Sequence, residues 1–291
     1  MKTSALILAL AVAAPFAHGA KKYTPLEKPG DVRVEVDVDF LGASRKEKAD
    51  LYFPLSIAKG QKVPAVIVIH GGGFNDGDKG RQREINTCRT LALNGYAAMS
   101  INYKLSIKDK ATWPQSVLDA KTAVRWLRTN AGRLQIDPAK IGAIGYSAGG
   151  NLSSMLAVTQ PKDGFEPAGD GATNITCAID IYGAVDLINY HDMKMFNKTR
   201  AEAPELYRKG SPTTYVDHGD APMLLIHGTA DETVPMSQSE TLAKALKAAG
   251  VEHELVIIPD APHTFDLELK QRDLRPVVLG FLDKHLKKAA H

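Results

Sequence analysis

One short glycine-rich stretch of the chain has the composition of a turn that carries a nucleophile. Residues 141–151 read IGAIGYSAGGN, an apolar run followed by Ser147, with Gly145 and Gly149 two positions to either side. This spacing fits the G-x-S-x-G pattern, in which a tight turn between a strand and a helix exposes a serine hydroxyl. A plain glycine-rich turn explains the glycines equally well, but it does not require a serine at its tip. The stretch therefore predicts that Ser147 is a nucleophile.

A serine hydroxyl is a weak nucleophile at neutral pH, so it needs a general base and a third group that orients the base. Asp231, in LLIHGTADETVP, and His263, in IIPDAPHTF, each follow an apolar run typical of a buried strand. The chain order serine, acid, histidine is the order of this fold type, and residues after parallel strands meet at one edge of the sheet. We expect Ser147, Asp231 and His263 to form a catalytic triad.

Three other carboxylates compete with Asp231 for the role of the acid. Asp186 follows the sixth predicted strand and is the main alternative, and Glu232 is adjacent to Asp231. Asp260 lies too near His263 along the chain to orient its ring easily. Two histidines at the ends of buried strands, His70 and His227, are explained better as hydrogen-bonding braces of their loops than as bases.

The segment HGGGF, residues 70–74, directly follows the first buried strand. Successive glycines present backbone N–H groups without side chains in the way, and such donors stabilise the negative charge that develops during acyl transfer. The N–H groups at the start of the helix after Ser147 point toward the same place. We expect Gly72, Gly73 and Ala148 to form the oxyanion hole.

The remaining pattern predicts the elements that position these residues. Residues 31–40 alternate strictly, as in a half-exposed strand, and residues 49–55 are its expected antiparallel partner. Continuous apolar runs, typical of strands buried on both faces, occupy residues 64–70, 96–103, 141–146, 175–183, 221–228 and 253–260. Helical patterns occupy roughly residues 82–94, 115–131, 148–158, 236–249 and 271–289. This alternation predicts an α/β fold with a mostly parallel, eight-stranded, doubly wound sheet.

The domain organisation is simple. Residues 21–291 are expected to form a single domain, in which residues 184–221 are a small cap inserted after the sixth strand, without a core of its own. Residues 1–20 have Lys2, an apolar stretch and a small-residue end, the layout of a cleaved signal peptide. The protein is therefore expected to be secreted or periplasmic, without a membrane anchor. A net charge of +3 with scattered basic residues argues against a nucleic-acid partner.

Export permits disulfides, so the two cysteines of the chain matter. Cys88 falls in a predicted helix and Cys177 at the start of a predicted strand, with no spacing pattern that joins them. Two buried free thiols are favoured, and a disulfide between them stays open.

From about residue 31 onward, the chain resembles the α/β-hydrolase superfamily, with HGGGF, GYSAGGN, HGTADETVP and PHTF in its order and spacing. Within it, the stretch AVRWLRTNAGRLQIDPAKIGAIGYSAGG is similar to small exported acetyl-xylan and feruloyl esterases. The hormone-sensitive-lipase branch usually has aspartate where this chain has Tyr146. The resemblance implies two-step acyl transfer on short acyl (acetyl) or feruloyl esters of plant polysaccharide or on related small esters, with no metal or organic cofactor.

The sequence leaves other functions open. A prolyl-oligopeptidase-type peptidase normally carries a propeller for which this chain has no room, and a true lipase needs an apolar lid, whereas the cap is polar. A generalist short-chain esterase is a further alternative. A non-catalytic binding domain is expected to lack a triad residue. Several large side chains either line a substrate site or pack in the core: Phe74, Trp113, Tyr146, Met193, Met195 and Phe196.

Overall fold

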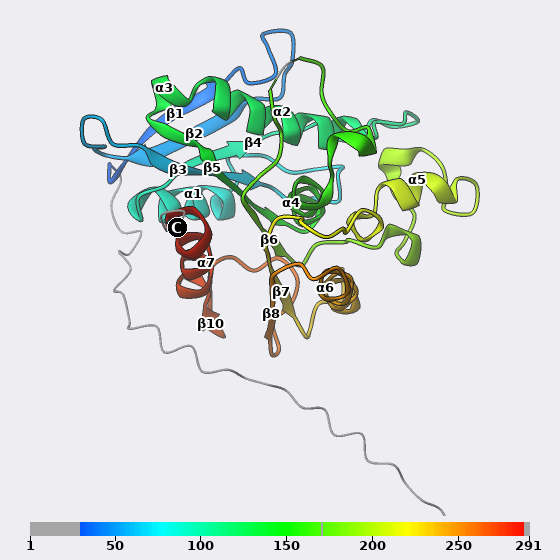
Figure 1. Cartoon of the computed structure of the whole chain (residues 1–291). Coiled ribbons are helices and arrows are strands. Elements are labelled where there is room, and N and C mark those ends of the chain that lie inside the picture. Colours follow the sequence, from blue (N-terminus) through cyan, green and yellow to red (C-terminus); the bar gives the residue numbers. More distant parts are fainter. Residues whose placement is uncertain (1–29, 170, 288–291) are drawn as a thin grey trace, which may run out of the picture.

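The computed structural model describes residues 30–169 and 171–287, so the predicted signal peptide lies outside the described residues (Figure 1). Its centre is an eight-stranded sheet in the order β1-β2-β4-β3-β5-β6-β7-β8. The strands are β1 Val32–Val38, β2 Ala49–Pro54, β3 Val63–Ile69, β4 Ala97–Ile101, β5 Ile136–Tyr146, β6 Cys177–Ile181, β7 Met223–Gly228 and β8 His253–Ile258.

Strand direction follows the sequence pattern. β1 and β2 pair antiparallel, β2 pairs antiparallel with β4, and the strands from β4 to β8 are parallel. Five of the six continuous apolar runs form central strands, which are covered on both faces, and all residues of β3, β4, β6 and β7 are buried. The prediction of a strand buried on both faces is wrong for residues 253–260, because this run forms the edge strand β8, in which Ile257 is 39% exposed. The predicted α/β-hydrolase fold with eight strands is confirmed.

The edge strand β1 differs from its prediction. Strict alternation predicts one covered face, yet Val34 is 42% and Val36 is 66% exposed. β1 has a neighbour on one side only, and its pairing with β2 shifts register between Glu35 and Val38. The shift follows Val34 and breaks the period of two for the residues beyond Glu35, Val36 among them.

Helices cover both faces of the sheet. One core includes side chains of α2 (Gln115–Thr129), α4 (Ala148–Val158) and α6 (Ser237–Ala249). A second core, on the other side, includes side chains of α1 (Gln82–Leu93) and α7 (Arg275–Leu282). A short helix, α3 (Ala131–Leu134), follows α2. No helix within residues 30–169 and 171–287 is both long and apolar enough to cross a bilayer.

The last helix begins later than its pattern predicts. Instead of a helix from residue 271, the chain forms a short hairpin of β9 (Glu268–Leu269) and β10 (Arg272–Asp273). α7 then starts at Arg275, because Pro276 lacks an N–H and is tolerated only in the first turn of a helix. A single π-helical turn, Asp283–Lys287, follows α7.

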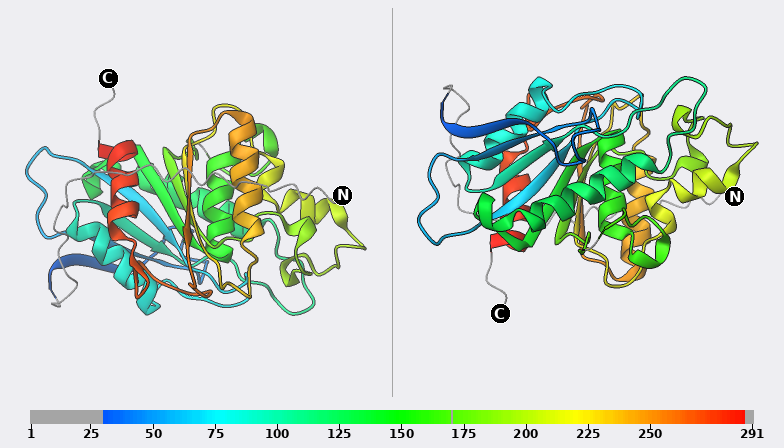
Figure 2. Two further views of the ribbon diagram at one scale, coloured as in Figure 1. Left: turned by 90° about the horizontal axis from the view of Figure 1, so that it is seen from below. Right: turned by 90° about the horizontal axis from the view of Figure 1, so that it is seen from above.

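The cap after β6 is a set of short elements, η2 (Leu187–Asn189), η3 (Lys194–Phe196), α5 (Pro204–Lys209) and η4 (Pro212–Thr214). Both views in Figure 2 place this yellow-green segment at the opposite end of the molecule from β1. Its buried side chains include Met193, Met195, Phe196 and Tyr207, which belong to the same core as α2, α4 and α6. The insertion is therefore an extension of the main core.

Candidate active site

Ser147 occupies a strained turn between β5 and α4. Its backbone has φ 57° and ψ −116°, a conformation that costs on the order of 1–3 kcal/mol for a residue with a side chain. The flanking glycines are required by close backbone contacts. A Cβ at Gly145 would lie 1.9 Å from the carbonyl oxygen of Gly149, and a Cβ at Gly149 would lie 2.1 Å from that of Ile69. The turn thus holds the Ser147 side chain at the carboxyl end of β5.

The third glycine of the motif lets α4 approach β6. A Cβ at Gly150 would lie 2.3 Å from Oδ1 of Asp180 and 2.9 Å from Cα of Gly183. The buried Asp180 carboxylate accepts hydrogen bonds from Ser154 Oγ at 2.8 Å and from the Gly183 N–H at 2.7 Å. Burial raises the pKa of Asp180 to about 6 in spite of these hydrogen bonds.

Ser147, His263 and Asp231 form a continuous chain of hydrogen bonds. His263 Nδ1 lies 2.6 Å from Asp231 Oδ2, and His263 Nε2 lies 3.1 Å from Ser147 Oγ. A carboxylate only accepts, so Nδ1 carries the proton and Nε2 is left as an acceptor for the serine hydroxyl. The Asp231 carboxylate is fully buried, whereas His263 is 12% exposed. The arrangement is that of a nucleophile, a base and the group that orients the base.

Asp231 has further hydrogen-bond partners besides His263. Its Oδ1 accepts the backbone N–H groups of Thr233 at 2.9 Å and Val234 at 2.8 Å. Its Oδ2 lies 3.3 Å from Nε2 of His227. Burial acts to raise the pKa of Asp231, but the hydrogen bonds from His227, His263 and Val234 outweigh burial and hold it well below its usual range. The carboxylate therefore stays ionised beside the imidazole.

His227, at the end of β7, braces this loop as the sequence suggests and also contacts the acid itself. Its Nε2 lies 2.8 Å from the Val234 carbonyl oxygen, which only accepts, so Nε2 carries a proton that also faces Asp231. Its Nδ1 pairs with Ser239 Oγ at 2.7 Å. Sequence reasoning missed the contact with the acid, although the spacing of four residues between His227 and Asp231 was visible.

Sequence reasoning also missed Tyr182, which packs under the histidine. Its ring centroid lies 4.6 Å from that of His263, and its hydroxyl donates to the Phe265 carbonyl at 2.7 Å. Arg83 donates to the Tyr182 hydroxyl oxygen at 3.1 Å and lies over the ring of Tyr146, 4.3 Å from its centroid. The only signal in the sequence was the position of Tyr182 at the end of a buried strand.

The glycine loop lies directly against the nucleophile. A Cβ at Gly71 would lie 2.8 Å from the Tyr146 carbonyl oxygen and 3.2 Å from Ser147 Cβ. Gly72 and Gly73 have φ of 115° and 59°, which favour glycine. Within the described residues, the N–H groups of Gly72, Gly73 and Ala148 donate to no backbone carbonyl. Within the described part of the chain no backbone acceptor competes for them, and their role as the oxyanion hole stays a prediction.

Five of the six large residues that are candidates for lining a substrate site are buried, among them Tyr146 and Phe74. Tyr146 is 0% and Phe74 is 1% exposed, so neither presents a surface to a substrate. The Tyr146 hydroxyl pairs with Thr87 Oγ1 at 2.6 Å. Trp113 is partly buried and packs edge-on against Phe165 and Phe196, with ring centroids 5.7 and 5.6 Å apart. The suggestion of a substrate-lining role for Tyr146 and Phe74 is therefore corrected to core packing.

The alternative acids have other surroundings. Asp186 accepts a hydrogen bond from Asn189 Nδ2 at 2.7 Å, and its own N–H donates to Gln238 Oε1. Glu232 is exposed to solvent, and the Asp260 backbone N–H donates to Thr229 Oγ1 at 2.9 Å. Among these four carboxylates, only Asp231 forms a hydrogen bond with His263 within the described residues.

The cysteines are free. Cys88 and Cys177 are both buried and unpaired within the described part of the chain. Burial raises the pKa of each thiol well above its usual range. They are packing residues on the α1 and α7 side of the sheet.

Residues 49–246 match the family described as BD-FAE, a segment that includes Ser147 and Asp231 and ends before His263. The chain belongs to the BD-FAE family of α/β-hydrolase esterases. It is 30% identical over 260 residues to esterase LipQ of Mycobacterium tuberculosis, an alignment that covers 84% of this chain and 61% of LipQ. The chain thus spans less than two thirds of this relative.

Solved structures extend the similarity to the whole fold of this BD-FAE protein. A truncated carbohydrate esterase from gut microbiota has a TM-score of 0.76 at 25% identity, covering 88% of this chain and 97% of the other. The propionate-bound thermophilic esterase Est2 of Thermogutta terrifontis has a TM-score of 0.72 at 26% identity, covering 90% and 97%. The family match ends at residue 246, so the role of His263 rests on its geometry.

Proposed function

We propose that this protein is an exported serine carboxylic-ester hydrolase that removes short acyl (acetyl) or feruloyl groups from plant polysaccharide or related small esters. The observation that carries the proposal is the hydrogen-bond chain from Ser147 through His263 to the buried Asp231. Membership of an esterase family supports the reaction class. The apolar, small-residue pattern of residues 1–20 supports export.

In the first step, Ser147 Oγ attacks the ester carbonyl carbon while His263 Nε2 removes the hydroxyl proton. The imidazolium that forms carries a proton on each nitrogen, and the Asp231 carboxylate stabilises its charge through Nδ1. The carbonyl oxygen becomes an oxyanion that accepts from the N–H groups of Gly72, Gly73 and Ala148. His263 then protonates the leaving alcohol oxygen, and the acyl group stays on Ser147.

In the second step, a water molecule takes the place of the alcohol. His263 Nε2 removes a proton from the water as its oxygen attacks the acyl carbon. The same backbone donors hold the second oxyanion. Collapse of this intermediate returns the proton to Ser147 Oγ and releases the carboxylic acid.

The substrate class is supported by two kinds of observation. The similar esterase Est2 has been solved with propionate, a three-carbon acid, which favours short acyl groups for this chain too. The similar carbohydrate esterase from gut microbiota favours a sugar-borne ester.

Hydrolysis of p-nitrophenyl acetate by the wild type and by Ser147→Ala tests the reaction. We expect kcat to fall by at least about 10⁴ in the variant, with an unchanged circular dichroism spectrum. A wild type without esterase activity, or a folded variant with full activity, contradicts the proposal. A panel of p-nitrophenyl acetate, butyrate and octanoate, methyl ferulate and acetylated xylan then ranks the acyl and alcohol groups.

A further inference from the structure

Arg83, the second residue of α1, carries a largely buried charge next to the site. Its side chain is 17% exposed, and its Nε and Nη2 donate to Oε1 of Glu84 at 3.0 and 2.5 Å. The Glu84 side chain is fully buried, so each residue compensates the charge of the other. A buried arginine is rare unless it is paired, and this ion pair accounts for two of the three guanidinium nitrogens. The third, Nη1, has a different partner.

The guanidinium also lies against the segments that carry the nucleophile and the glycine loop. Its Cζ is 4.3 Å from the ring centroid of Tyr146, the residue directly before Ser147. A Cβ at Gly71 would lie 3.5 Å from Nη2 of Arg83 and 3.2 Å from Cβ of Ser147. Arg83 and Ser147 therefore both border the space beside Gly71.

The remaining nitrogen of Arg83 holds the tyrosine that packs under the histidine of the triad. Nη1 donates to the Tyr182 hydroxyl oxygen at 3.1 Å. The hydroxyl has a single proton, which it donates to the Phe265 carbonyl at 2.7 Å, so its oxygen accepts from Arg83. The Tyr182 backbone has φ 46°, a conformation that few residues other than glycine adopt. The position of the ring therefore depends on the two contacts of its hydroxyl.

Tyr182 connects the arginine to both reacting groups. Its ring centroid lies 4.6 Å from that of His263, whose Nε2 is 3.1 Å from Ser147 Oγ. The Ser147 N–H donates to the carbonyl of Ile181, the residue before Tyr182, at 2.9 Å. This short segment thus contacts the nucleophile through its backbone and the base through a ring. A misplacement of about 1 Å between such groups can lower a rate about 10²-fold, so the position of the ring matters for the reaction.

We propose that Arg83 is a positioning residue for the esterase reaction: it holds the Tyr182 ring and, through that ring, the imidazole of His263. This inference rests on the proposed function, because it assigns Arg83 a part in the same reaction. Arg83 acts through Tyr182 and is not itself a catalytic group. An ion pair with Glu84 alone would explain the burial of Arg83, but it does not require Nη1 to reach Tyr182.

Arg83→Lys separates the two roles, because lysine keeps the charge beside Glu84 but lacks the fork of donors that also reaches Tyr182. In steady-state hydrolysis of p-nitrophenyl acetate, we expect kcat to fall at least about tenfold, as for the loss of one hydrogen bond to a charged group. KM is expected to stay within about twofold of the wild type. The matched control is Arg89→Lys in the same helix, where the side chain is 20% exposed and Nη2 lies 4.0 Å from Oδ2 of Asp31. Its kcat should stay within about twofold of the wild type.

Tyr182→Phe tests the route of the effect, because phenylalanine keeps the ring beside His263 and removes the hydroxyl that accepts from Arg83. If Arg83 acts through this hydroxyl, the double variant Arg83→Lys/Tyr182→Phe loses no more activity than Tyr182→Phe alone. Losses that multiply in the double variant contradict the proposal. An Arg83→Lys protein that unfolds at a lower urea concentration but keeps the wild-type kcat also contradicts it, since this is the behaviour of a purely structural ion pair.

The activity of the wild type separates this inference from the proposed function. An inactive wild type overturns the esterase proposal and the positioning role with it. An active wild type whose kcat is unchanged in both Arg83→Lys and Tyr182→Phe overturns the positioning role alone. If Arg83→Lys does not fold, Tyr182→Phe decides by itself: a lower kcat at unchanged KM supports the role, and an unchanged kcat overturns it.

Discussion

Replacement of Asp231 by asparagine separates the role of the acid in orienting His263 from its role in packing. The side chain keeps its shape, and Oδ1 still accepts from Thr233 and Val234. The other terminal atom, which lies 2.6 Å from His263 Nδ1, becomes an NH₂ donor. A donor at this position forces Nδ1 to accept, so the ring must carry its proton on Nε2. Nε2 then faces Ser147 as a donor and cannot remove the hydroxyl proton.

The size of the loss follows from the geometry. The base is held in the wrong tautomer, while the nucleophile and the backbone donors stay in place. The corresponding change in serine proteases lowers kcat by about 10⁴. At about 1.36 kcal/mol for each factor of ten, this is about 5.4 kcal/mol of transition-state stabilisation. KM is expected to change little, because the buried carboxylate does not reach the substrate.

The assay is steady-state hydrolysis of p-nitrophenyl acetate by Asp231→Asn and by Asp186→Asn as the matched control. Asp186 carries the same chemical group in the segment that follows the neighbouring strand β6, and its carboxylate accepts a hydrogen bond from Asn189. We expect the control to stay within about threefold of the wild type, since no triad contact changes. Near-normal kcat in Asp231→Asn with a large loss in Asp186→Asn refutes the assignment of the acid.

Three further predictions concern the support of the site. His227→Leu removes the N–H that faces the acid, and kcat/KM is expected to fall about tenfold, the equivalent of one hydrogen bond to a charge. His253→Leu is the control, and equal effects of the two substitutions contradict the contact. Gly150→Ala places a Cβ 2.3 Å from Asp180 Oδ1 and should lower the free energy of unfolding by about 1–3 kcal/mol in urea titration. Gly280→Ala is the control for this variant: no atom lies within 4 Å of the added Cβ, so it should not lower the free energy of unfolding. The folded-state pKa of Asp180, about 6, exceeds the usual 3.8, so the wild type loses stability as pH rises through that window. The free energy of unfolding of Asp180→Asn should therefore rise by about 3 kcal/mol relative to that of the wild type between pH 4 and pH 7. A difference between the two proteins that does not depend on pH contradicts this.

Most of the sheet could be predicted because its strands are long apolar runs. Runs such as residues 64–70 and 221–228 are buried on both faces, and the burial itself requires the composition that marks them. The turn at Ser147 could also be predicted, because only glycine tolerates the contacts at positions 145 and 149. In these places one local requirement determines both the sequence and the structure.

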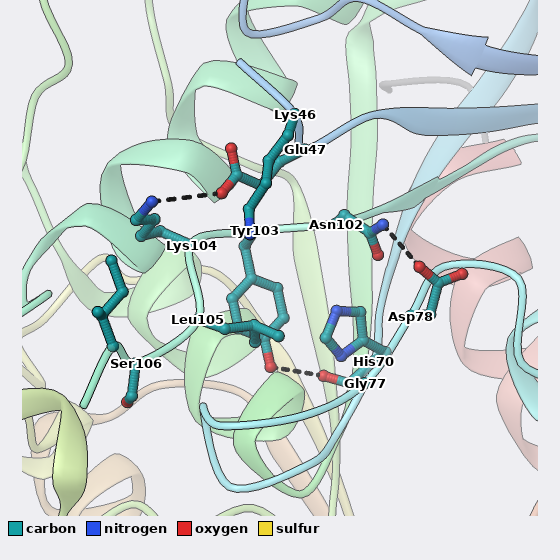
Figure 3. A pocket seen from close by; sticks show the side chains of 11 residues that line it. Lys46, Glu47, His70, Gly77, Asp78, Asn102, Tyr103, Lys104, Leu105 and Ser106 are labelled. Carbon is teal, nitrogen blue, oxygen red and sulfur yellow. Dashed lines mark hydrogen bonds and ion pairs between the residues drawn. The ribbon is translucent and has the colours of Figure 1, made fainter.

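The features that could not be predicted depend on contacts between distant segments. The register shift of β1 depends on its partner β2, and nothing in residues 31–40 marks it. Tyr182 lies beside His263 because the segments that follow β6 and β8 meet at one edge of the sheet, and a tyrosine at a strand end is common. The cavity drawn in Figure 3 is lined by residues that lie far apart in the sequence and share no motif, among them Glu47, His70 and Ser106.

Next to the nucleophile, the buried carboxylate of Asp180 combines a local requirement for glycine with contacts between distant segments. Asp180 lies where α4 comes so close to β6 that glycine is needed at both 150 and 183, and it links the two segments through Ser154 and the Gly183 N–H. Burial raises its pKa to about 6, so the charged form is held at a cost in stability at pH 7. A neutral residue of the same shape would avoid that cost. In return, the hydrogen bond from Ser154 and the close packing at Gly150 hold the first turns of α4 against β6, directly after the strained turn at Ser147.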